Sequence, residues 1–248
     1  MEAYEQKAYE EVQVWLRKME KRASMSQAFA KSMQTKMNRL VPTQIHSALG
    51  QAVRQMINGV LNGSDYLPTK KQTEAKSLQE ADGRLENLVT VFQKGAAAEG
   101  AGTGAGGLLL GAVDFPLLLA FKMRFLFSAA GIYGVDSADL HDRLYMLYLF
   151  QVAFSSPSKR RETVEILKNW STLAGGDSQQ SPEAIEVDWS SFQQEYRDHI
   201  DFVKLLQLMP GFGAAVGAAA NYHLLGQLGE AAKQGYRLHW LRGKYKDL

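Results

Sequence analysis

The stretch GAAAEGAGTGAGGLLLGAVDFP, residues 95–116, decides how the rest of the chain is interpreted. It contains a formal G-x-G-x-x-G at Gly102, Gly104 and Gly107, which is the pattern of a dinucleotide-binding loop. That pattern binds a nucleotide only between a strand and a helix, with an acidic residue about twenty positions further on. The residues around position 122 read LAFKMRF, and no repeated βαβ pattern surrounds the glycines. We therefore reject a nucleotide-binding loop.

The glycines instead predict a helix with one smooth face. Residues 95–111 contain seven glycines, which would cost an isolated helix about 7 kcal/mol relative to alanine, so close packing has to compensate. A second small-residue segment, PGFGAAVGAAANYHLL at 210–225, offers a matching face. We expect the two segments to pack closely at the centre of the molecule, as in small-xxx-small contacts. The glycines expected in this contact are Gly100, Gly104, Gly107, Gly111, Gly213 and Gly217.

Insertion into a membrane is the alternative for the same region. Residues 101–121 carry no formal charge except Asp114, and their number is sufficient to cross a bilayer. However, Asp114 followed by Phe115 and Pro116 is typical of an N-cap with proline in the first helical turn, which favours a break over a continuous span. Soluble packing is the favoured interpretation, while a shallow hairpin and a spanning helix stay open as alternatives.

The remainder of the chain predicts an all-α protein. Only six prolines occur in 248 residues, and long stretches lack the alternation of β-strands. We expect a single multi-helix domain of about eight to ten helices. An amphipathic N-terminal helical segment, residues 1–42, precedes the main helical domain, residues 43–248.

Several helix ends have local signals. Gly134 is expected to end the helix that precedes it, and Asp136 is expected to cap the next one. Ser156 followed by Pro157 predicts a further helix start, with serine as the N-cap and proline at the first position.

Composition excludes several classes of function. There is no cysteine, which excludes disulfides, thiolate metal sites and cysteine nucleophiles. The net charge is only +2 and no nucleic-acid-binding motif is present, so no nucleic acid is expected as a partner. The N-terminus, MEAYEQKAYEEVQVWL, carries acids where a signal peptide needs basic residues. We therefore expect a cytoplasmic protein.

Four patterns resemble the EcsC-like family of bacterial proteins. They are E-G-x-G-x-G-x-G-G at 99–107, Asp114-x-Pro116, YGVD at 133–136 and G-x-x-V-G-A-x-x-N at 213–221. The resemblance extends over roughly residues 75–242. It implies a helical fold, a bacterial origin and a membrane-linked context, because the family is named for an accessory gene beside an ABC-transporter operon. A membrane transporter is therefore a candidate partner, while the resemblance transfers no catalytic residue.

The segment 17–39 is strongly basic, with Glu20 as its only acid. It predicts either a solvated basic face over a helix packed on the core, which we favour, or an amphipathic helix that binds anionic lipid at the inner face of the cell membrane. The candidate membrane-surface residues are Arg17, Lys18, Lys21, Arg22, Lys31, Lys36 and Arg39.

Support for an enzyme is thin, and no metal or other cofactor is expected. The five histidines are scattered and form no H-E-x-x-H, and the spacing of Asp139, His141 and Asp142 at a helix start favours capping and surface charge over a metal site. If the two small-residue segments pack together, four polar residues could converge on a pocket, although roles as caps and packing polars are favoured. These four candidates are Glu99, Asp114, Asn221 and His223.

The sequence therefore favours a non-catalytic accessory protein that associates with the cytoplasmic membrane surface or lipid in a transport or envelope context. A hydrolase-like enzyme or a carrier of apolar ligands, using the four-residue pocket, is the first alternative. A soluble helical scaffold that binds another protein is the second.

Overall fold

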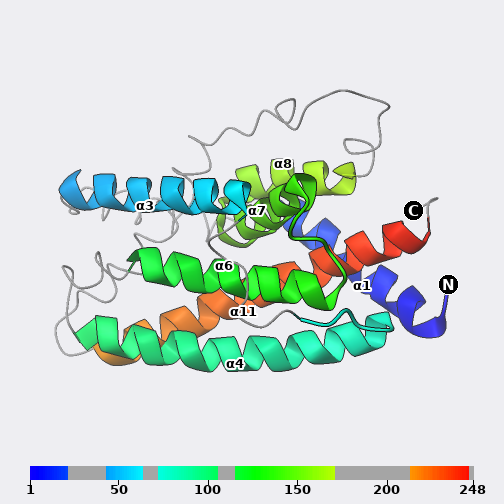
Figure 1. Ribbon diagram of the computed structural model, residues 1–248, viewed down its shortest axis with the longest axis horizontal. Coiled ribbons are helices and arrows are strands. Elements are labelled where there is room, and N and C mark those ends of the chain that lie inside the picture. The colour runs from blue at the N-terminus through cyan, green and yellow to red at the C-terminus, as the bar shows by residue number, and fades with distance from the viewer. Residues whose placement is uncertain (22–42, 64–71, 106–114, 171–212, 246–248) are drawn as a thin grey trace.

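The computed structural model describes residues 1–21, 43–63, 72–105, 115–170 and 213–245. These residues contain seven helices and no strand, which confirms the all-α class; eight to ten helices were expected for the whole chain (Figure 1). The helices are α1 (Ala3–Glu20), α3 (Thr43–Asn62), α4 (Leu78–Ala105), α6 (Phe115–Ile132), α7 (Leu140–Phe154), α8 (Pro157–Lys168) and α11 (Gly213–Lys244).

The two longest helices, α4 and α11, pack against each other along most of their lengths (Figure 1). A Cβ atom added to Gly100 of α4 would lie 2.7 Å from the carbonyl carbon of Gly217 of α11 and 2.8 Å from Nδ2 of Asn221. Real Cβ atoms do not approach other atoms so closely, so the two backbones are in contact here. The two Gly/Ala-rich helices are thus packed closely, as the sequence predicted. The surroundings of four further glycines fall outside what the structure describes: Gly104, Gly107, Gly111 and Gly213.

The α4–α11 contact changes character along its length. Next to the contact of Gly100 with Gly217, side chains of α4 pack against glycines of α11. Further along the pair, toward the N-terminus of α4, the two helices are joined by ion pairs. Because α4 numbers fall as α11 numbers rise, the two helices are antiparallel. Successive contacts join Gln93 Nε2 to the Tyr222 carbonyl oxygen at 3.3 Å, Val89 to Gly229, Lys233 to Glu86 at 2.8 Å, and Arg237 to Asp82 at 2.9 Å.

Helix α6 lies beside α4 and forms part of the core. Phe92 of α4 contacts Phe121 and Phe125 of α6, with ring centroids 4.8 and 5.5 Å apart. Within the described ranges, α6 is the single helix that is long and apolar enough to cross a membrane, but most of its residues are buried inside the protein. Its apolar character is therefore explained by its place in the bundle. Residues 106–114, with Asp114, lie outside the described part, so the cap expected at Asp114 is not described.

The N-terminal helix shares the core with the later helices. Val12, Trp15 and Leu16 of α1 are buried, and α1 packs on α11 and α8. Helices α6 and α7 carry most of the large buried side chains, and α3 covers α6 from the other side (Figure 1).

Local signals predict two helix ends correctly and one incorrectly. Gly134 has φ +73° just after α6, and Ser156 with Pro157 starts α8. The N-cap of α7 is Asp139, however, and not Asp136. Asp136 instead accepts a hydrogen bond from the Ala138 N–H, which makes a short turn before the helix begins.

Candidate functional site

The four-residue pocket expected from the sequence is not assembled by the three of its members that the structure describes. Asn221 is buried at the contact with Gly100, and Glu99 is half-buried beside that contact. His223 is exposed, and its Nε2 lies 3.1 Å from Nε2 of Gln227, one turn further along α11. Positions two apart on a helix point in directions about 200° apart, so Asn221 and His223 cannot share a face.

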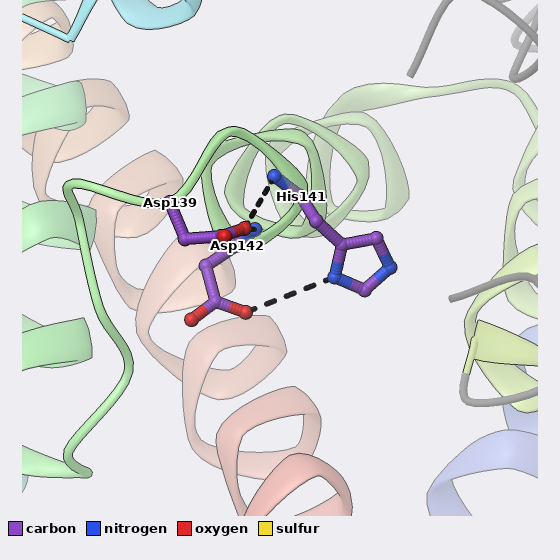
Figure 2. Close-up of side chains that lie close together, drawn as sticks. All are labelled: Asp139, His141 and Asp142. Atoms are coloured by element: carbon purple, nitrogen blue, oxygen red, sulfur yellow. Dashed lines mark hydrogen bonds and ion pairs between the residues drawn. The ribbon is translucent and has the colours of Figure 1, made fainter. Parts of the chain in front are cut away.

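Asp139, His141 and Asp142 form a polar cluster at the start of α7 (Figure 2). Asp139 Oδ1 accepts hydrogen bonds from the His141 N–H at 2.7 Å and the Asp142 N–H at 3.2 Å, which confirms its capping role. Asp142 Oδ2 accepts a hydrogen bond from the Asp136 N–H at 2.9 Å. The cluster therefore fixes the turn between α6 and α7.

The same cluster joins α7 to α11. Asp142 Oδ1 lies 3.9 Å from Nδ1 of His141 (Figure 2) and 3.4 Å from Nε2 of His239 on α11. Burial raises the pKa of Asp142, but the two imidazoles and the Asp136 N–H hold it well below its usual range. The ligand atoms of Asp139, His141 and Asp142 lie within 4.8 Å of one another, close enough for a metal ion. However, both carboxylates already accept backbone N–H groups, and we assign the cluster a structural role.

A second polar cluster, which the sequence did not reveal, is buried where α1, α4 and α11 meet the end of α6. Asp82 of α4 accepts hydrogen bonds from the hydroxyls of Tyr4 at 2.7 Å and Tyr133 at 2.5 Å. It also pairs with Arg237 of α11, which in turn pairs with Glu11 of α1 at 2.6 Å. Asp82 and Arg237 are both almost completely buried.

The pKa shifts of the groups around Asp82 follow from burial and from their contacts in this cluster. Burial and the neighbouring Asp82 carboxylate raise the pKa of Tyr4 to about 12, and the same causes raise the pKa of Tyr133 further. Burial lowers the pKa of Arg237, but Asp82 and Glu11 raise it above its ordinary value. Both tyrosines are therefore neutral donors at physiological pH, and the network locks four parts of the chain together. Asp82, Tyr133 and Arg237 are buried, while Tyr4 and Glu11 are partly exposed at the edge of the network.

Three of the four acids of α1 pair with other parts of the protein, whereas Glu10 is exposed and accepts a hydrogen bond from Gln6 of the same helix. Glu5 is buried and accepts hydrogen bonds from Lys244 Nζ at 2.7 Å and from the Tyr245 hydroxyl at 2.6 Å. Glu11 pairs with Arg237, and Glu20 pairs with Lys168 of α8. Each of these three acids is neutralised by a cation of a different helix.

The cations at the C-terminal end of α1 are directed toward solvent. Arg17, Lys18 and Lys21 are exposed, and none of them forms an ion pair with any residue that the structure describes. Val14, one turn before them, is 58% exposed. The chain therefore presents an exposed basic surface with an apolar residue beside it. The other four cations predicted for a membrane surface lie outside the described residues: Arg22, Lys31, Lys36 and Arg39.

The described residues thus form a helical protein in which two polar clusters, around Asp82 and Asp142, join the helices, and the end of α1 presents a basic face. They contain no assembled catalytic centre. The family model described as the EcsC protein family matches residues 6–241, and the chain belongs to this family. The match includes α1, so it extends further toward the N-terminus than the resemblance over 75–242 implied.

Two relatives from Bacillus subtilis (strain 168) are similar to the chain. "Protein EcsC" is 44% identical over 228 residues, which cover 92% of each chain. "Uncharacterized protein YdbA" is 24% identical over 231 residues, covering 85% of this chain and 84% of the relative. No solved structure matches.

Proposed function

We propose that this protein is a non-catalytic accessory protein that associates with the anionic cytoplasmic surface of the bacterial cell membrane. The observation that carries the proposal is the separation of charge on α1. Three of its four acids, Glu5, Glu11 and Glu20, pair with cations of other helices, while Glu10 lies toward its N-terminal half. At its C-terminal end Arg17, Lys18 and Lys21 remain exposed.

The electrostatic contribution of this basic face is large enough to matter. Each lysine or arginine near an anionic leaflet contributes about 1 kcal/mol, so the three described cations together contribute about 3 kcal/mol. The sequence continues with four more cations up to residue 39, all within the same basic segment. Exposed Val14 adds apolar contact, and binding is expected to weaken in salt because the attraction is screened within about 10 Å at 0.1 M ionic strength.

A transport or envelope role is part of the proposal and rests on membership of the EcsC family. A membrane transporter stays a candidate partner on the same ground. The alternative of a hydrolase-like enzyme or apolar-ligand carrier has no comparable observation in its favour, since Asn221 and His223 point to different sides of α11.

The proposal is tested by co-sedimentation of the full chain with vesicles of phosphatidylcholine, with and without phosphatidylglycerol, at increasing salt. We expect binding that requires the anionic lipid and is lost at high salt. The triple variant Arg17→Glu, Lys18→Glu, Lys21→Glu should bind more weakly by tenfold or more.

A control variant makes the same change in net charge elsewhere on the surface. Arg54, Lys76 and Arg161 are also exposed, and their replacement by glutamate changes the net charge by the same amount. This control should lose much less affinity. If wild-type protein binds neither vesicle, or if both triple variants lose affinity equally, the basic face of α1 does not bind the membrane.

A further inference from the structure

A second surface with an unusual composition lies on the C-terminal half of α4 and the adjoining turns of α6 and α11. We call it the α4 flank. Its α4 members are exposed and recur at helical spacing, so they lie on one face of the helix. The α4 flank consists of Val91, Lys94, Gly95, Ala98 and Gly102 of α4, Leu117 and Arg124 of α6, and Tyr222 of α11.

The three helices meet at the surface of this flank. On one side of α4, a Cβ atom on Gly95 would lie 2.9 Å from the ring of the half-buried Phe121 of α6. On the other side, Gln93 donates a hydrogen bond to the carbonyl oxygen of Tyr222. These contacts place α6 and α11 next to α4, which forms one long edge of the molecule (Figure 1).

The flank exposes large apolar side chains. Val91 is 66% exposed, Leu117 is 65% exposed and Tyr222 is 48% exposed. These are three of the five large hydrophobic side chains that are exposed in the described part of the chain. Between them, Gly95, Ala98 and Gly102 contribute a surface without polar side chains.

The charges of the flank have one sign. Lys94 and Arg124 are exposed, and neither forms an ion pair within the described ranges. From Val91 to the end of α4, the only acid is the half-buried Glu99, and α6 up to Arg124 and α11 up to Gly229 contain none. The N-terminal half of α4, in contrast, exposes Glu80 and Glu86.

We propose that the α4 flank is a lipid-contact surface that lies flat in the interface of an anionic phospholipid leaflet. This deepens the proposed membrane association and rests on it. Val91, Leu117 and Tyr222 enter the boundary between head groups and acyl chains, as the apolar face of an interfacial helix does. Lys94 and Arg124 extend their charged ends to the lipid phosphates.

The contact between α4 and α11 suits this position. On the side of α4 away from the lipid, Gly100 meets Gly217 backbone to backbone. Close packing of small residues holds helices together by van der Waals contact and does not depend on the hydrophobic effect. The α4–α11 pair therefore stays assembled when its outer face moves from water into the lipid interface. The ion pairs Asp82–Arg237 and Glu86–Lys233 lie at the opposite, polar end of the same helix pair.

The absence of cysteine allows a direct test of depth. Single-cysteine variants Ala98→Cys and Leu117→Cys report on the flank, and Gln79→Cys on the exposed polar half of α4 is the matched control. Each is labelled with the fluorophore NBD and mixed with phosphatidylcholine–phosphatidylglycerol vesicles. We expect a blue shift, a several-fold rise in emission and quenching by nitroxide-labelled lipids at positions 98 and 117, and none of these at 79.

The outcomes separate this inference from the proposed function. If the protein co-sediments with vesicles but labels 98 and 117 stay in water, the flank is not the lipid contact and the membrane association stands. If the labels respond to protein concentration without lipid, the flank binds a second copy of the chain, and the inference is wrong. If the protein binds no vesicle, both proposals fail.

Charge and polarity variants give an independent reading. Leu117→Glu and Lys94→Glu should each weaken vesicle binding about tenfold, while Gln79→Glu should leave it within twofold. All three positions are exposed, so the thermal unfolding temperature should stay unchanged. Equal binding by Leu117→Glu and Gln79→Glu would overturn the inference.

Discussion

The contact between Gly100 and Gly217 predicts that replacing Gly100 by alanine destabilises the protein, which is opposite to the usual effect of this substitution in a helix. When an exposed glycine inside a helix is replaced by alanine, the protein normally becomes more stable by about 0.5–1 kcal/mol. At Gly100 the added methyl group would lie 2.7 Å from the carbonyl carbon of Gly217 and 2.8 Å from Asn221 Nδ2. The first of these atoms belongs to the backbone and cannot rotate away, so α4 and α11 would have to separate.

Overpacking of this kind costs about 1–3 kcal/mol, which exceeds the helix-propensity gain. We therefore expect Gly100→Ala to lower the free energy of unfolding by about 1–2 kcal/mol, with a fall in melting temperature of about 2–8 °C for a chain of this length. The measurement is urea denaturation followed by circular dichroism, with thermal melting as a second readout.

Helix α4 provides its own control for this experiment. Gly83 is exposed, and a Cβ atom added there would meet nothing within 4 Å. Gly83→Ala should therefore raise the free energy of unfolding by about 0.5–1 kcal/mol. The opposite signs of the two substitutions on one helix are the test. If Gly100→Ala stabilises the protein as much as Gly83→Ala, the close approach of α4 to α11 is refuted.

Three further predictions concern the polar clusters, each measured by chemical denaturation. Arg237→Met leaves the buried Asp82 carboxylate without its cation and should cost about 3–5 kcal/mol, while the double variant with Asp82→Asn should recover part of the loss. Asp142→Asn should cost about 1.5–3 kcal/mol at pH 7. Because the folded pKa of Asp142 is depressed, its contribution is present above the unfolded pKa near 4 and is lost as the pH falls below it, so the variant and wild type should converge in acid. Asp139→Ala should cost about 1 kcal/mol through loss of the α7 N-cap, and an unchanged stability would contradict that role.

The sequence predicted those features that depend on neighbouring residues or on helical spacing. Gly134 and the Ser156–Pro157 pair mark helix ends because each requires only a local backbone conformation. The close contact of two Gly/Ala-rich helices was predictable because so many glycines in a helix need compensation from a partner. The incorrect cap at Asp136 shows the limit of this approach, since Asp136 and Asp139 carry the same side chain and only the exact start of α7 separates their roles.

The buried cluster around Asp82 and Arg237 could not be predicted because its members are far apart in the chain. Asp82 and Arg237 are separated by 155 positions, and the acid lies in EADGRLENL, a polar stretch that is typical of a solvent-exposed helix. Nothing in that stretch marks Asp82 as the acid that becomes buried. The candidate pocket presents the opposite case, because two of its described members are close in sequence but do not share one face of their helix. Asn221 and His223 are close in sequence, but the pitch of α11 turns one inward and the other outward.

The charge of the surface also depends on the fold. A net charge of +2 predicts no general affinity for polyanions, because 28 basic residues are nearly balanced by 26 acidic ones. That balance does not hold locally, since folding directs Glu5, Glu11 and Glu20 of α1 against cations of other helices. Arg17, Lys18 and Lys21 are then left facing solvent. A nearly neutral chain can in this way present a locally basic surface, and it is this local charge that an anionic membrane would attract.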